Sequence, residues 1–171
     1  MLHLVKTMST FDSTEHRIAR CAERLPEYPQ RLVTLNRLAY HLQKRTQDQL
    51  NAAMKSHGLT TVGYTVLMVL YGSDHETQRA SELSEACSEK PANLTRICDD
   101  LEKQGLIKRR FSAEDRRSVA ISLTAAGRKR VEQVAPEYWS ILHRTYDGIT
   151  DKHLEKQEGM LRQQLENLEK N

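Results

Sequence analysis

The sequence predicts a mainly α-helical fold with one small β-hairpin, and two observations lead to this prediction. Between residues 81 and 124, two short helical patterns are followed by two strand-like runs joined by the charged tip AEDRR at 113–117. Charged residues make up 29% of the chain and aromatic residues only 5%, which is typical of a helix-rich protein. Two helices set at an angle can place the second in a DNA major groove, and a basic hairpin tip beside it can reach the next minor groove. This arrangement is a winged helix-turn-helix.

Length and composition set the broad class. The 171 residues suffice for one domain with a sizeable hydrophobic core. No apolar run approaches the length of a membrane span, and the opening MLHLVKTMST is too short and too weakly apolar for a signal peptide. We therefore expect a cytoplasmic protein without membrane contact. The three cysteines lack metal-ligand spacing and are odd in number, so no disulfide framework, metal or cofactor is predicted.

The two ends of the chain are predicted to be helical. Residues 1–29 should form an N-terminal arm with one short helix, and residues 30–57 one long helix with a leucine stripe. Residues 125–171 should form two more helices, the first of them kinked at Pro136. The last helix carries leucines close to heptad spacing, which implies a partner helix. These leucines are Leu154, Leu161, Leu165 and Leu168. We therefore assign 30–57 and 125–171 to dimerisation.

The remaining segment, 58–124, is assigned to the winged helix-turn-helix. Its first helix is apolar nearly all round and should form the core. Ser81 is the predicted cap of the next helix, and Thr124 that of the long helix after the hairpin. The predicted elements are helices at 61–71, 81–87 and 91–104 and strands at 106–111 and 119–123.

Positive charge is concentrated after the helix predicted at 91–104. Residues 105–130 include eight basic and two acidic side chains, a net charge of +6, whereas the other residues carry 18 basic and 21 acidic ones, or −3. By itself, such a patch fits a solvated surface equally well. Beside a predicted helix-turn-helix, it favours contact with DNA phosphates.

Two motifs in this region resemble those of the MarR family of bacterial transcriptional regulators. LTRICDDLEKQGLI at 94–107 is similar to the family's recognition-helix motif, and DRRSVAISLTAAG at 115–127 is similar to its wing tip, second strand and capped helix start. The resemblance covers about residues 30–171. It implies an obligate homodimer that acts as a repressor and is released by a small anionic aromatic ligand. The NxTRI pattern at 93–97 resembles the subgroup that controls multidrug efflux or aromatic-acid catabolism.

Ten residues are candidate DNA contacts. Asn pairs well with adenine and Arg with guanine, so Asn93, Thr95 and Arg96 could contact base edges. The alternative is a solvated helix face, or Arg96 tied to Asp115. In the family, the arginine that matches Arg117 enters the minor groove while the residue matching Asp115 orients the wing. The full set is Lys90, Pro91, Ala92, Asn93, Thr95, Arg96, Arg110, Asp115, Arg116 and Arg117.

The sequence departs from the family pattern at the start of this helix. Lys90 stands where many members have a small or acidic capping residue. It could contact a phosphate, or Ser88 could supply the cap, so the first residue of the helix stays open. A two-fold dimer should bind a pseudo-palindromic operator with half-sites about one helical turn apart.

Six aromatic and cationic residues are candidate ligand contacts for a small aromatic or heteroaromatic carboxylic acid or phenol. Two tyrosines on one face of the apolar helix could line a cleft, and a histidine and an arginine four apart on the first helix could bind a carboxylate. A tyrosine and a histidine of the long helix lie off its leucine stripe. For the two tyrosines of the apolar helix, the alternative is packing in the core. For the other four residues, the alternative is an ordinary surface position. The residues are His16, Arg20, Tyr40, His41, Tyr64 and Tyr71.

The sequence leaves open one alternative mode of regulation and argues against an enzyme. Some relatives in the family sense oxidants through an N-terminal cysteine, so a redox-sensing repressor acting through Cys21 is the alternative. Cys98, on the inner stripe of its helix, is expected to be a small core residue. An enzyme is not expected, because the chain has no GxSxG or HExxH motif and no glycine-rich phosphate loop.

Overall fold

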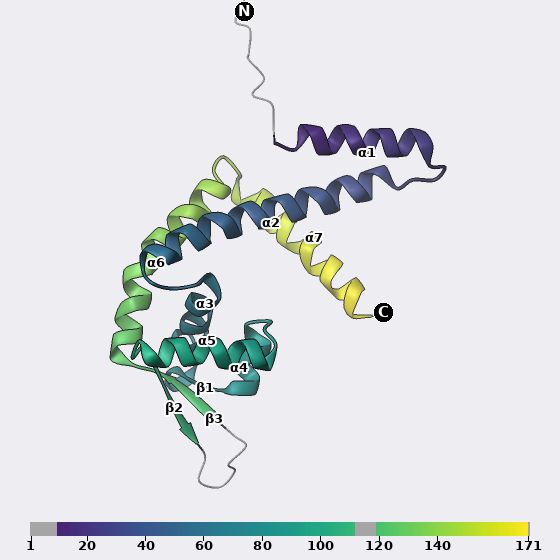
Figure 1. Ribbon diagram of the computed structural model, residues 1–171. Coiled ribbons are helices and arrows are strands. Elements are labelled where there is room, and N and C mark those ends of the chain that lie inside the picture. Colours follow the sequence, from purple (N-terminus) through teal and green to yellow (C-terminus); the bar gives the residue numbers. More distant parts are fainter. Residues whose placement is uncertain (1–9, 112–118, 171) are drawn as a thin grey trace, which may run out of the picture.

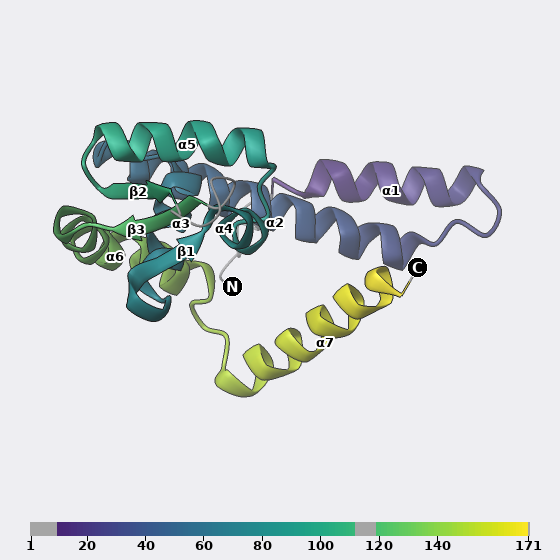
Figure 2. The same ribbon diagram turned by 90° about the horizontal axis from the view of Figure 1, so that it is seen from below.

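The computed structural model describes residues 10–111 and 119–170, which are mainly helical with one small sheet (Figure 1). The predicted fold class is confirmed. The helices α3, α4 and α5 gather with the sheet into one body, while α1, the first half of α2 and α7 extend away from it (Figures 1 and 2). In chain order, the elements are α1 (Asp12–Arg24), α2 (Gln30–Ser56), α3 (Thr61–Tyr71), the 3-10 turn η1 (Asp74–Glu76), β1 (Thr77–Arg79), α4 (Ala80–Ala86), α5 (Pro91–Lys103), β2 (Ile107–Phe111), β3 (Val119–Leu123), α6 (Ala125–Thr145) and α7 (Asp151–Glu169).

The core is built around α3, as its apolar sequence predicts. Val66, Leu67 and Leu70 of this helix are completely buried. From α5, the core receives the inner stripe Leu94, Ile97, Cys98 and Leu101. Burying a leucine or isoleucine side chain contributes about 1.5–3 kcal/mol, so this stripe fixes which face of α5 points outward.

The sheet has three strands in the order β1-β3-β2, and both pairings are antiparallel. The predicted hairpin forms between β2 and β3, with Ile107 opposite Leu123 and Arg109 opposite Ile121. The third strand, β1, was not predicted. Its three residues TQR show no apolar alternation, and the strand exists because it pairs with β3, where the hydroxyls of Thr77 and Ser122 lie 2.9 Å apart.

The predicted N-terminal caps of α6 and α4 have different outcomes. The hydroxyl of Thr124 accepts the backbone N–H of Gly127 at 3.0 Å, which confirms it as the cap of α6. The prediction for α4 was wrong, because this helix starts at Ala80 and Ser81 lies inside it. The carboxylate of Glu82 reaches back to accept the N–H of Arg79 at 3.1 Å and so satisfies a donor at that end.

The helices of the two chain ends expose many apolar side chains. No residue of α7 is buried, and Leu161, Leu165 and Leu168 are 53%, 59% and 77% exposed. Leu32 and Leu35 of α2 are also more than half exposed. The helix α6 continues through Pro136 and is drawn as one curved helix in Figure 1. Among the helices that the structure describes, none is both long and apolar enough to span a membrane.

At Gly127, α6 approaches the turn before β2 closely. A Cβ added there would overlap the carbonyl oxygen of Leu106 and lie 2.8 Å from Leu123 Cδ1. We expect Gly127→Ala to lower the free energy of unfolding by about 1–3 kcal/mol, the usual effect of overpacking, as measured by urea denaturation. The matched control is Gly159→Ala in α7, where a Cβ meets nothing within 4 Å, and stability should hold or rise. An unchanged midpoint for Gly127→Ala would contradict this packing.

Candidate nucleic-acid interface

The helix α5 is amphipathic and lies on the outside of the body (Figure 2). Its inner stripe is buried, whereas Pro91, Ala92, Thr95 and Arg96 are exposed and Asn93 is partly exposed. The outward face is therefore polar and basic at its N-terminal half, which is the half that base contacts require.

The start of α5 is settled by the turn that connects it to α4. The helix begins at Pro91, with Lys90 at the N-cap position and no side-chain cap. Ser88 does not cap the helix and has a positive φ of 53° within the turn. The hydroxyl of Ser84 donates to the Glu89 carbonyl oxygen at 2.5 Å and holds the turn in place. Lys90 is exposed at the helix N-terminus.

A chain of hydrogen bonds runs along the outward face of α5. The Asn93 amide Nδ2 donates to the Glu89 carboxylate at 2.6 Å, and the Arg96 guanidinium donates to Asn93 Oδ1 at 3.1 Å. The Thr95 hydroxyl donates to the Pro91 carbonyl at 2.9 Å, within its own helix. Both ends of the Asn93 amide are thus engaged, and Arg96 is held by Asn93 in these described contacts.

The hairpin contributes one described candidate contact. Arg110 is exposed on β2, opposite Ala120 of β3. The other three wing candidates, Asp115, Arg116 and Arg117, lie outside the described residues.

Fewer basic side chains of the segment 105–130 are free to contact DNA than its net charge suggests. Arg128 donates two hydrogen bonds to the Glu76 carboxylate, at 2.8 and 2.5 Å, and these bonds lower the pKa of Glu76. Arg130 donates to the carbonyl of His57 at 2.7 Å. Arg109 is bonded to α5. These three arginines tie elements of the fold together, whereas Lys108, Arg110 and Lys129 remain exposed on the described surface.

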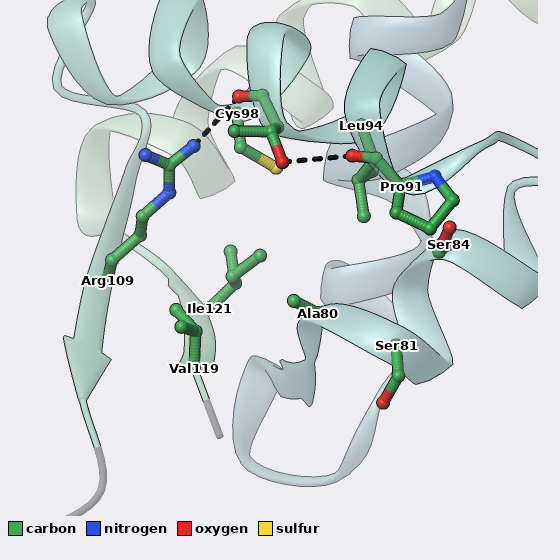
Figure 3. A pocket seen from close by; sticks show the side chains of 10 residues that line it. Ala80, Ser81, Ser84, Pro91, Leu94, Cys98, Arg109, Val119 and Ile121 are labelled. Atoms are coloured by element: carbon green, nitrogen blue, oxygen red, sulfur yellow. Dashed lines mark hydrogen bonds between the residues drawn. The ribbon is translucent and has the colours of Figure 1, made fainter. Parts of the chain in front are cut away.

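Arg109 is the functional candidate that sequence reasoning missed. Its guanidinium donates to Asp99 Oδ1 at 2.5 Å and to the Thr95 carbonyl at 2.9 Å. Figure 3 shows it turned towards α5 at the edge of a cavity of about 420 Å³ between α4, α5 and the sheet. The signal was present in the alternation of β2, because Arg109 lies two residues after the buried Ile107 and so shares its face.

The six predicted ligand residues are not brought to one place. Tyr64 is 1% exposed, its ring lies 5.4 Å from that of Tyr138, and its hydroxyl has no hydrogen-bond partner among the described residues. Burial, together with Tyr138, raises the pKa of Tyr64. The structure therefore places Tyr64 in the core, in line with the alternative of core packing. Tyr71, at the far end of α3, is 40% exposed and its hydroxyl lies 3.5 Å from Glu132.

The remaining candidates lie on α1 and α2. His16 and Arg20 are exposed on α1, and Arg20 pairs with Glu23 at 2.7 Å. Tyr40 and His41 line a hollow on α2 with Lys44 and Arg45. The guanidinium of Arg37 lies 5.0 Å from the Tyr40 ring centroid. Among the six ligand candidates, Tyr40 and His41 are the two that line the same hollow in the described part of the chain.

The three cysteines occupy different environments. Cys21 is exposed on α1, and Cys98 is buried, which confirms its prediction as a core residue. Burial raises the pKa of Cys87 to about 11 and also raises that of Cys98, so both stay protonated at neutral pH. In the described part of the chain, no group of three or more His, Cys, Asp or Glu residues is placed to hold a metal ion.

Comparison with known proteins gives consistent matches. The family model for the transcriptional regulator SarA/Rot matches residues 49–134. The chain is 30% identical over 161 residues to the transcriptional repressor MprA of Escherichia coli K12, covering 94% of this chain and 92% of MprA.

Two solved structures show the same fold. One is Sco3205, a MarR family transcriptional regulator from Streptomyces coelicolor in complex with DNA, with a TM-score of 0.74 and 22% identity over 78% of this chain and 85% of that one. The other is BpsR from Bordetella bronchiseptica, with a TM-score of 0.69 and 21% identity over 76% of this chain and 97% of that one. The relatives are transcriptional regulators and not enzymes. With a family model over half its length and a repressor matched along nearly all of it, the chain belongs to the MarR family of winged helix-turn-helix transcriptional regulators.

Proposed function

We propose that the chain is a homodimeric, sequence-specific repressor that a small aromatic or heteroaromatic acid or phenol releases from its operator. The observation that carries the DNA-binding part is the outward face of α5. Its inner stripe is buried in the core, and the exposed N-terminal half presents Lys90, Thr95 and Arg96. The DNA complex of its structural relative Sco3205 supports this use of the fold.

Within this face, we assign base contact to Arg96 and a supporting role to Asn93. An asparagine that pairs with adenine needs both its amide nitrogen and its oxygen. In Asn93 these atoms already bond Glu89 and Arg96. Arg96 keeps the rest of its fork of donors exposed, and that fork matches O6 and N7 of guanine. Asn93 then holds the arginine at the orientation that base contact needs.

The homodimer is supported by the apolar side chains of the terminal helices. Leu35, Leu38 and Leu42 of α2 face Leu142 and Leu161 across one hollow. Within the described residues of one chain, none of these leucines is buried. A second copy whose terminal helices fill the hollow would bury them, at about 25 cal/mol for each Å² of apolar surface. We therefore assign 30–57 and 125–171 to dimerisation and 58–124 to DNA binding.

The effector proposal rests on the hollow along α2. Tyr40 supplies an aromatic face, and His41, Lys44 and Arg45 supply hydrogen-bond donors, of which Lys44 also pairs with Asp48 at 3.4 Å. Aromatic walls with a few cationic groups suit a small planar acid. The DNA binding of BpsR is regulated by 6-hydroxynicotinic acid, a molecule of this class. His16 and Arg20 stay candidates because α1 packs on α2.

An effector can release the operator only if it binds the DNA-competent arrangement less tightly than another one. A hundredfold difference in affinity corresponds to about 2.7 kcal/mol, which shifts a two-state equilibrium by the same factor. The redox alternative would act through Cys21, which is exposed on the same helix as His16 and Arg20.

The DNA contacts can be tested with a duplex that the protein selects from a random-sequence library. Arg96→Ala should lower affinity for this duplex by about 1–3 kcal/mol per half-site and relax preference at one base pair, measured by fluorescence anisotropy at fixed salt. Asn93→Ala should relax preference at the same base pair, because it frees Arg96. Gln104→Ala, at the other end of α5, is the control and should change neither. If Asn93→Ala relaxes a different base pair, Asn93 contacts DNA itself.

Dimerisation can be tested by light scattering after size-exclusion chromatography. Leu161→Asp with Leu165→Asp should give a monomer, because two charges would enter the proposed apolar interface. Gln163→Asp adds charge to the opposite face of α7 and should leave the dimer intact. A double variant that stays dimeric would rule out α7 as part of the interface.

The effector can be sought among hydroxylated benzoic and nicotinic acids by thermal shift, followed by release of the labelled operator. His41→Ala or Arg20→Ala should raise the acid concentration needed for release without changing operator affinity in acid-free buffer. Arg31→Ala, exposed elsewhere on α2, should respond as the wild type does. Release by peroxide instead of acids, abolished by Cys21→Ser, would favour the redox alternative.

A further inference from the structure

Arg109 of β2 is bound to three positions along one side of α5. Its guanidinium bonds Asp99 at 2.5 Å and the Thr95 carbonyl at 2.9 Å, and it lies 3.5 Å from Glu102. Its backbone N–H donates to the other oxygen of Glu102 at 3.0 Å. Positions 95, 99 and 102 follow one another at spacings of four and three, so a single strand residue spans about two turns of the helix.

These contacts are enclosed enough to be specific. The side chain of Arg109 is 20% exposed, against 44% for Asp99 and 40% for Glu102. In Figure 3, Arg109 turns from its strand towards α5. An arginine held by two bonds from its fork fixes both distance and orientation between the elements it joins.

The net charge of this cluster argues against a role in attracting DNA. One guanidinium and two carboxylates sum to −1, on the helix that presents the proposed base contacts. A negative cluster beside a phosphate backbone repels it. The adjacent Arg110 lies on the opposite face of β2 and is exposed, with no ion pair among the described residues.

We propose that Arg109, with Asp99 and Glu102, is a positioning cluster that fixes the angle between the recognition helix and the wing, and so sets sequence discrimination without contacting DNA. This inference rests on the proposed DNA-binding function of α5. When the helix and the wing are held as one unit, base contact by α5 and backbone contact by the hairpin form together or not at all. Loss of the cluster lets each form without the other, which preserves non-specific binding and removes specific binding.

The decisive variant is Asp99→Asn. It makes the protein more positive, and a simple electrostatic account therefore predicts tighter binding to any DNA. The positioning cluster predicts the opposite for the operator. Affinity for the selected duplex should fall about tenfold or more, comparable to losing one base contact, while affinity for a scrambled duplex stays the same or rises. Asp100→Asn, the exposed neighbour on the same helix, is the matched control and should not weaken operator binding.

The paired arginines separate positioning from phosphate contact. Arg109→Met should reduce operator affinity and leave the salt dependence of binding unchanged. Arg110→Met should weaken both duplexes alike and reduce the slope of log affinity against log salt by about 1 if Arg110 contacts a phosphate. The double variant Asp99→Asn with Arg109→Met should bind the operator no more weakly than the poorer single variant, because both changes break one interaction.

Each outcome has a defined meaning. The positioning role would be overturned if Asp99→Asn left operator affinity unchanged, or raised it as much as affinity for the scrambled duplex. A reduced salt slope for Arg109→Met would also overturn it. Should Asp99→Asn unfold, Glu102→Gln gives the same test, since its amide oxygen still accepts the Arg109 N–H while the charge is lost. A wild-type protein that selects no sequence at all would refute the proposed function itself.

Discussion

The burial of one stripe of α5 against α3 is the constraint on which the rest of the molecule depends. Leu94, Ile97 and Leu101 are each at most 6% exposed, and α3 beneath them is among the most buried parts of the chain. Rotating α5 would expose this stripe, so its outward face is as fixed as the core itself. Because α5 is held this way, its polar residues need no partner of their own to stay on the surface.

Electrostatics divides the basic residues into two groups with different physical roles. Arg109, Arg128 and Arg130 bond carboxylates or carbonyls of other elements and so connect the sheet, α2, α5 and α6. Lys90, Arg96 and Arg110 are exposed on elements that this first group holds in place. Counting net charge along the sequence merges the two groups, although the guanidinium groups of the first are engaged with other elements of the fold.

The sequence predicted best what is encoded locally. The apolar segment of α3, the proline that opens α5 and the hydroxyl of Thr124 each act within a few residues, and all three are where they were expected. The strand β1 has no such signal, since its three residues become a strand only by pairing with β3, more than 40 positions away. Ser81 failed as a cap because Glu82 satisfies the end of α4 from within the helix.

Periodicity also predicted the faces of α3 but not the depth of each residue. Tyr64 and Tyr71 are seven residues apart and share a side of the helix, yet Tyr64 lies beneath Tyr138 while Tyr71 lies at the exposed end. The role of Arg109 could not be predicted for a related reason, since it depends on how a strand and a helix meet. The position of a side chain is thus predictable where one element presents it, and not where two elements combine.

The proposed function requires that two copies of this chain place α5 in successive major grooves of one operator. Methylation interference at guanine N7 tests it directly, because N7 lies in the major groove. We expect two clusters of interfering guanines, related by two-fold symmetry and about one helical turn apart. Interference confined to one cluster, or none on a duplex that the protein selects and binds tightly, would contradict it.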